Sequence, residues 1–164
     1  MHPIHDVDAL ILLATALASK RRPAEIVEIM AAIDLLQDNI PTEAKLVEAF
    51  ARLASHGLLN EVDGRFALTP EAQKIIQAQP RKADTAERLF GIKDGLSMHN
   101  AKGEFAAIVL TEEAFRSAIV AHRAAAASTA KNLLVPKPKP EEKSVQRPGQ
   151  RQRKPMPAAR RRKP

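Results

Sequence analysis

Apolar side chains recur at helical spacing in three stretches of the first half of the chain. Each stretch has one apolar face, which is the pattern of an amphipathic helix that packs on a core. The apolar positions are Leu10, Leu13 and Leu17 in the first stretch, Ile26, Ile29, Met30 and Ile33 in the second, and Leu46, Phe50 and Leu53 in the third. The sequence therefore predicts one helix over 9–18, a second that Pro23 opens, and a third with Thr42 as its N-cap.

A two-stranded hairpin is predicted directly after the third helix. Gly57 can adopt the positive φ that ends a helix. The runs 58–62 and 65–69 contain apolar residues and flank Asp63-Gly64. Because this dipeptide accepts positive φ at both positions, it is the strongest short-range hairpin signal. Thr69-Pro70-Glu71 then begins a fourth helix, with a cap, a proline at the first position and an acid near the positive end.

Residues 81–130 predict an accessory helix–strand–helix segment. Asp84 is the expected start of a helix, 106–110 is a short apolar strand candidate, and Thr111 caps a last helix. The segment is too short for a second complete copy of the unit before it. We expect it to pack on the first domain or to form a dimer contact.

The order of three helices, a turn and a hairpin within the first half of the chain resembles the winged helix-turn-helix superfamily of bacterial regulators. The phrases RLASHGLL and GRFALT carry this resemblance, which covers 6–78. It implies that the third helix enters the DNA major groove and that the hairpin wing contacts phosphates or the minor groove. It also implies a homodimer formed through a helix after the wing. The expected fold is mostly α with a small β-hairpin: a winged helix-turn-helix domain (1–80), an accessory helical segment (81–130) and a disordered basic tail (131–164).

Charge is segregated along the chain. Residues 131–164 carry 12 Lys and Arg against 2 Asp and Glu, a net +10, whereas residues 1–130 carry 14 against 17, a net −3. The tail is also rich in proline and poor in large apolar residues, so it cannot bury enough surface to offset the entropy of ordering. We expect a disordered arm that adds nonspecific affinity for nucleic acid. The alternatives are a solubilising extension and, with less support, a membrane-surface anchor, since no amphipathic basic helix accompanies the tail.

The same charges bear on DNA contact by the folded part. Phosphate neutralisation supplies most of the affinity of DNA-reading domains. Here the exposed face of the third helix is formally neutral and the wing is negative. If the domain reads DNA, Lys45, Arg52 and Ser55 face the groove, and Arg65 touches phosphates. The full set of expected nucleic-acid contacts is Lys20, Arg21, Arg22, Lys45, Arg52, Ser55 and Arg65 in the domain, and Arg151, Arg153, Lys154, Arg160, Arg161, Arg162 and Lys163 in the tail.

Other chemistries have little support in the sequence. Cysteine is absent, and none of the five histidines has metal-site spacing with carboxylates on one helical face. Neither a phosphate-binding Gly-Lys-Ser/Thr loop nor a Gly-x-Ser-x-Gly elbow occurs. We therefore expect no enzyme activity, no cofactor and no metal. The apolar stretch 9–18 is too short to span a bilayer and follows acidic residues, so we expect a cytoplasmic protein with no membrane contact.

Two hypotheses of function follow. The leading one is a DNA-associated winged-helix protein of the bacterial cytoplasm, a transcriptional regulator with double-stranded DNA as its partner. The competing one is a protein-interaction adaptor, in which an acidic winged helix binds a basic or mixed partner and the tail anchors the chain to nucleic acid or ribosomes. An RNA-binding accessory protein is a third, weaker alternative. A positive stripe that joins Arg21, Lys45 and Arg65 would favour DNA, and a negative third-helix face would favour the adaptor.

Overall fold

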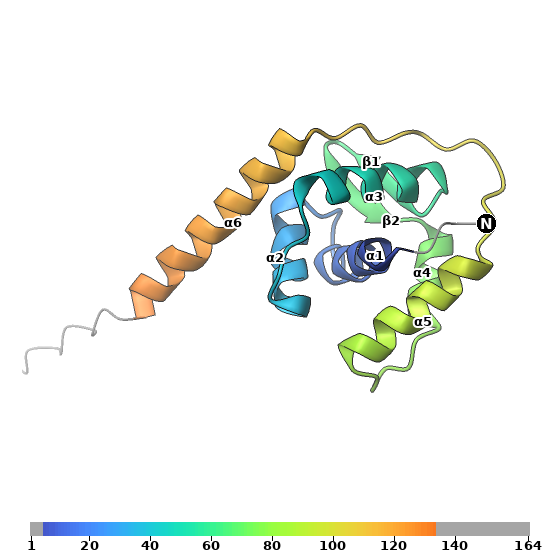
Figure 1. Cartoon of the computed structure of the whole chain (residues 1–164), viewed down its shortest axis with the longest axis horizontal. Helices are drawn as coiled ribbons and strands as arrows, with labels where there is room; N and C mark the ends of the chain where they lie inside the picture. Colours follow the sequence, from blue (N-terminus) through green and yellow to red (C-terminus); the bar gives the residue numbers. More distant parts are fainter. Residues whose placement is uncertain (1–4, 134–164) are drawn as a thin grey trace, which may run out of the picture. The chain divides into compact units, whose positions relative to one another are not determined.

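The computed structural model of the chain describes residues 5–133, with side chains described up to residue 128. Residues 131–133 of the predicted tail belong to the last helix, and 134–164, with the seven predicted nucleic-acid contacts of the tail, lie outside the described residues. The described part is mostly helical and contains one small antiparallel hairpin (Figure 1), as the sequence predicts. Its elements are α1 (Asp6–Ala18), α2 (Ile26–Gln37), α3 (Glu43–Ser55), β1 (Leu59–Val62), β2 (Arg65–Leu68), α4 (Pro70–Gln77), α5 (Thr85–Met98) and α6 (Glu112–Leu133).

Helix α1 lies at the centre of the apolar core. Residues 9–14 of this helix are buried, and α2, α3, α4, α5 and β2 all pack against it (Figure 1). Helix α6 packs on α2 and α3, and it places Phe115 in the same core. Ile92 and Leu96 of α5 also join this core. Apolar side chains of residues 81–128 therefore share one hydrophobic core with those of residues 5–80.

The hairpin forms at the predicted turn. Leu59 pairs with Leu68 and Val62 with Arg65, which leaves Asp63-Gly64 as a two-residue loop. Both loop residues have positive φ, 52° and 73°, which is the conformation of a type I′ turn. The predicted turn is confirmed because this dipeptide accepts that conformation at low cost.

The second helix begins later than the sequence predicts. It starts at Ile26, and Pro23 lies in the preceding link rather than in the helix. Ala24 is instead bridged to Phe66 of β2 by two backbone hydrogen bonds of 2.8 Å. Since this bridge already satisfies the backbone N–H and C=O of Ala24, the helix begins only after it. Glu25 is the N-cap, and Glu25 and Glu28 form a capping box.

The other predicted helix starts fall where local capping places them. The Thr69 hydroxyl accepts a hydrogen bond from the Ala72 N–H at the start of α4, and the Asp84 carboxylate accepts one from the Glu87 N–H in α5. Thr42 is the N-cap residue of α3 by its backbone conformation, although its side chain makes no capping hydrogen bond. Capping residues thus locate helix ends from sequence alone.

The predicted strand at 106–110 is absent from this described segment. Residues 104–110 form an irregular connection between α5 and α6 (Figure 1). Ile108 is 4% exposed, whereas Val109 is 86% exposed, so the segment is held by single anchoring side chains. An apolar run becomes a strand only when an open sheet edge pairs with it, and none does so here.

Gly57 has a constraint that goes beyond its positive φ. Its φ is +66°, and a Cβ atom built there would lie 2.4 Å from the ring of Phe105, whereas Gly64 has φ +73° and open space around it. We expect Gly64→Ala to lower the free energy of unfolding by about 1 kcal/mol, the cost of left-handed backbone in a residue with a Cβ. Gly57→Ala is expected to cost more, because the Phe105 ring must also move. Urea denaturation of both variants measures the difference.

The role of the Phe105 ring in this difference in stability can be tested by changing Phe105 itself. Adding Phe105→Ala to Gly57→Ala should remove the extra loss and leave only the backbone cost. Equal losses for Gly57→Ala and Gly64→Ala would show that the Phe105 ring does not restrict this glycine.

Candidate nucleic-acid interface

The exposed face of α3 is nearly without available positive charge. Lys45 is exposed near the start of the helix, with Glu48 exposed one turn later. Ser55 is also exposed, but its hydroxyl donates a hydrogen bond of 2.8 Å to the carbonyl of Arg52 in its own helix. One lysine and one nearby acid therefore dominate the face that would approach a groove.

Arg52 binds within the protein instead of facing outward. Its Nε and Nη2 atoms donate hydrogen bonds of 3.1 and 2.8 Å to the two carboxylate oxygens of Asp8 in α1. The Asp8 side chain is fully buried and that of Arg52 is 23% exposed, with Glu48 3.5 Å from Nη1. The hydrogen bonds to Asp8 are the main cause of a raised pKa of Arg52. Arg52, for which the sequence predicts a groove contact, thus forms an ion pair that joins α1 to α3.

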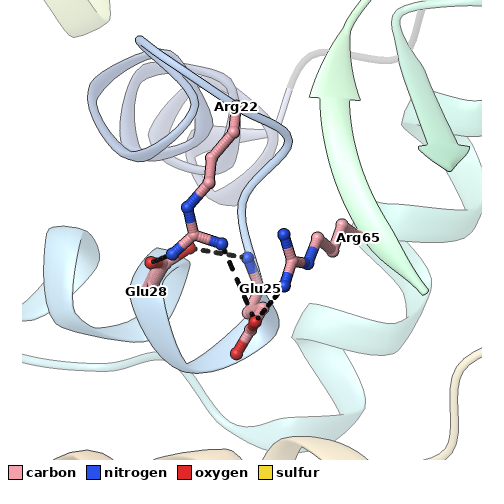
Figure 2. Close-up of polar contacts among 4 residues, drawn as sticks. All are labelled: Arg22, Glu25, Glu28 and Arg65. Atoms are coloured by element: carbon pink, nitrogen blue, oxygen red, sulfur yellow. Dashed lines mark hydrogen bonds and ion pairs between the residues drawn. The ribbon is translucent and has the colours of Figure 1, made fainter. Parts of the chain in front are cut away.

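Arg22 and Arg65 are brought together by acidic residues at the start of α2 (Figure 2). The Arg22 Nη2 donates to Glu28 Oε1 at 2.5 Å, and Arg65 Nη2 donates to Glu25 Oε1 at 2.9 Å. Glu25 Oε1 also lies 3.8 Å from Arg22 Nη1. These four residues carry two positive and two negative charges, and we call them the Arg–Glu network. It ties the α1–α2 link to β2 and is formally neutral.

The wing and the remaining basic residues complete the surface. Glu61 and Asp63 are exposed on the wing, and its Arg65 belongs to the Arg–Glu network. Lys20 and Arg21 are exposed in the α1–α2 link, where Lys20 lies at a hollow beside α4 that Leu68 also lines. Among the described residues, neither Lys20 nor Arg21 forms an ion pair within 4.0 Å. Of the three residues of the hypothesised positive stripe, Arg65 is paired with Glu25, whereas Arg21 and Lys45 are exposed.

The residues that the sequence analysis missed are the acidic partners. Glu25 and Glu28 stand three apart before an apolar run, which is a recognisable capping-box spacing. In sequence, Asp8 stands out only as one of the acidic residues directly before the apolar stretch 9–18. Capping could have been inferred for Glu25 and Glu28. The pairing of Asp8 with a residue 44 positions away could not.

Three histidines of the described part, His56, His99 and His122, take part in contacts between elements. His122 on α6 lies with Nε2 3.0 Å from Asp34 Oδ2 on α2, and its side chain is 16% exposed. His99 Nε2 lies 3.0 Å from the His56 carbonyl oxygen. Burial is the main cause of a lowered pKa of His56, with His99 adding to it. The contacts of His122 and His99 join separate helices and loops of the fold.

Neither the described residues nor comparisons with known proteins indicate a metal site, a membrane span or a family. No group of three or more metal-ligating side chains occurs among the residues that the structure describes. Within the same part of the chain, no helix is both long and apolar enough to cross a membrane. No protein-family model, curated protein or solved structure matches the chain.

Proposed function

We propose that residues 1–80 are a winged helix-turn-helix domain that acts as a protein-interaction module, and that the basic tail associates the chain with nucleic acid. The order of α1, α2, α3 and the hairpin supports the fold assignment. The backbone bridge between Ala24 and Phe66 supports it further, because it holds the hairpin against the helical body as a wing. Dimerisation through α6 stays a prediction.

The observation that carries the proposal is that three arginines predicted to contact DNA are paired with acidic side chains of the domain itself. Arg22, Arg52 and Arg65 each lie within hydrogen-bonding distance of a carboxylate of the domain itself. A phosphate that bound Arg52 would take this guanidinium from the buried Asp8 carboxylate, and one that bound Arg22 or Arg65 would compete with Glu28 or Glu25. Specific DNA binding draws much of its affinity from several Lys and Arg side chains that each neutralise a phosphate. A face with Glu48, Glu61 and Asp63 exposed better suits a partner protein with a basic or mixed surface.

The tail is the proposed source of affinity for nucleic acid. It carries 12 of the 26 basic residues of the chain and only 2 of its 19 acidic residues. Lys and Arg side chains without base-reading geometry bind phosphates and carry no sequence information. We therefore propose that the tail anchors the chain to nucleic acid while the folded domain recruits a protein.

A DNA-reading regulator is the second candidate. The exposed Lys45 favours it, because this residue lies near the start of α3, where recognition helices contact base edges. Lys20 and Arg21 are exposed as well and could contact phosphates beside that helix. In this alternative, the folded domain itself chooses the DNA site and the tail only strengthens binding.

The experiment is duplex binding by fluorescence anisotropy at two salt concentrations. We would compare the full chain with a chain that ends at Leu134, since residues 1–134 form one compact unit. A full-length variant with glutamine at the seven basic tail positions of the predicted set is the matched control. We expect duplex affinity to fall with salt, with a logarithmic slope on the order of −0.9 for each phosphate neutralised. We expect binding to be lost both on truncation and on charge removal.

Lys45→Ala separates the two candidates. The adaptor proposal expects this variant of the full chain to bind all duplexes as the unchanged chain does. If the chain ending at Leu134 still selects one duplex sequence over another, and Lys45→Ala abolishes that selection, the DNA-reading regulator replaces the adaptor.

A further inference from the structure

We propose that the junction between α4 and α5 contains a binding site for a small organic anion that has one carboxylate or phosphate group and a short apolar portion. The site is a pocket of about 420 Å³ at this junction, floored in part by α1. Its main lining residues are Leu13, Ile76, Gln77, Gln79, Arg81 and Arg88. The volume falls within the range of small-molecule sites, roughly 300–1,000 Å³.

Arg88 supplies the first argument, because its guanidinium is held in place but incompletely used. Its Nη2 atom donates a hydrogen bond of 2.6 Å to the backbone carbonyl of Arg81. Its Nε atom is buried and has no hydrogen-bond partner among the described residues. Buried donors in native proteins are almost always paired, and an arginine Nε–H can only donate. This atom is closed to solvent, so a bound oxyanion would instead accept hydrogen bonds from the Nη N–H groups that the Arg81 carbonyl leaves unused.

The charge of the pocket supplies the second argument. Two arginines line it, and none of its described lining residues is acidic. Arg22, Arg52, Arg65 and Arg116, in contrast, each have a carboxylate of the protein within 4.0 Å. The nearby Asp84 carboxylate is occupied, since it caps α5 by accepting the Glu87 N–H. The guanidinium groups at this junction are therefore available to an anion from solution.

Carbonyl groups at the C-terminal end of α4, beside the pocket, are already hydrogen-bonded within the protein. The C-terminal end of a helix carries partial negative charge, which would repel an oxyanion beside α4. Here the protein's own donors occupy those carbonyls. The Gln79 side chain donates to the Ile75 carbonyl at 3.0 Å, and the Gln79 N–H donates to the Ile76 carbonyl at 3.2 Å.

The remaining lining residues define the rest of the ligand. Leu13 and Ile76 offer apolar surface, and the Gln77 amide can donate or accept one hydrogen bond. Arginine pairs with planar carboxylates and with phosphates through two parallel hydrogen bonds. A small molecule with one such group and a short apolar body matches this pocket. The site does not depend on the nucleic-acid proposal, since none of its residues belongs to the predicted interface.

Calorimetry and thermal melting of the full chain test the site, with benzoate and phenyl phosphate as probes and benzamide as the neutral control. Buffers would be free of phosphate and matched in ionic strength. We expect benzoate or phenyl phosphate to bind saturably and to raise the melting temperature, and benzamide to do neither. The probe that binds more tightly identifies the group as carboxylate or phosphate.

Arg88→Gln is the decisive variant, and Arg123→Gln is its control, because Arg123 is exposed on α6 outside the pocket. Both variants keep the basic tail, so anion binding by the tail is the same in each. We expect Arg88→Gln to weaken binding at least about tenfold, the loss typical of a hydrogen bond to a charged group, and Arg123→Gln to have no effect. If Arg88→Gln does not fold, Arg81→Gln, which keeps the carbonyl that Arg88 uses, takes its place with the same expectation. Equal binding by all variants, or no saturable binding of either anion, would overturn the site.

Discussion

Replacing Phe50 with alanine is expected to lower the free energy of unfolding by about 3–5 kcal/mol, as for a large aromatic side chain removed from a core. Phe50 is fully buried, with its ring centroid 5.3 Å from that of Phe66 in β2 and 5.2 Å from that of Phe115 in α6. The change removes contacts that join α3 to the hairpin and to α6, and it leaves a cavity that helices can close only partly. Urea denaturation followed by circular dichroism measures the loss.

Phe90 is the matched control for this result. It lies on α5 with its side chain 72% exposed, so Phe90→Ala should change the free energy of unfolding by no more than about 0.5 kcal/mol. Similar losses for the two variants would show that α6 and the hairpin do not meet on Phe50.

Replacing Arg52 with methionine is expected to lower the free energy of unfolding by about 3 kcal/mol, close to the lower end of the range for breaking a buried ion pair. The Asp8 carboxylate is fully buried and would lose the guanidinium that neutralises it. The low end applies because Arg52 is 23% exposed, so water screens part of the attraction. Methionine retains much of the apolar stem of arginine, which isolates the loss of charge.

Arg65→Met and a double variant complete this test. Arg65 is 40% exposed and binds the exposed Glu25, so its replacement should cost less than about 1 kcal/mol. Asp8→Leu combined with Arg52→Met should cost less than the sum of the two single changes, because the double variant buries no unpaired charge. Additive losses would mean that Asp8 and Arg52 act independently.

The Arg52 result also determines how DNA-binding variants should be interpreted. A loss of duplex binding on substitution of Arg52 would follow from unfolding, whether or not α3 touches DNA. Lys45 is exposed and makes no ion pair within 4.0 Å in the described part of the chain, so its substitution changes the surface without that effect. Lys45 is therefore the informative position on α3.

The local features of the fold could be predicted because neighbouring residues determine them. Asp63-Gly64 specifies its turn through backbone conformations that it adopts by itself. Thr69 and Asp84 cap helices by bonding to N–H groups three residues ahead. Helical periodicity likewise needs only the side chains of one stretch, so the core-facing residues of α3 were predicted correctly.

Features that depend on distant partners could not be predicted in the same way. An apolar run at 106–110 does not indicate whether a sheet edge will be open to it, and Pro23 does not indicate that Ala24 will bond to Phe66 before α2 begins. The predicted interface has the same weakness. Sequence shows that Arg22, Arg52 and Arg65 are basic, but the number of positive charges left for a partner depends on which carboxylates the fold places beside them.

The amino-acid order alone was sufficient for the mostly helical fold, the hairpin, the helix caps and the concentration of positive charge in the tail. Each of these depends on composition or on residues a few positions apart. Folding to a common core was needed to bring Asp8 to Arg52 and Glu25 to Arg65, and to leave the Nε atom of Arg88 buried without a partner among the described residues. Electrostatic and hydrogen-bond energies depend on distances in space, and residues 40 or more positions apart acquire those distances only when the chain folds.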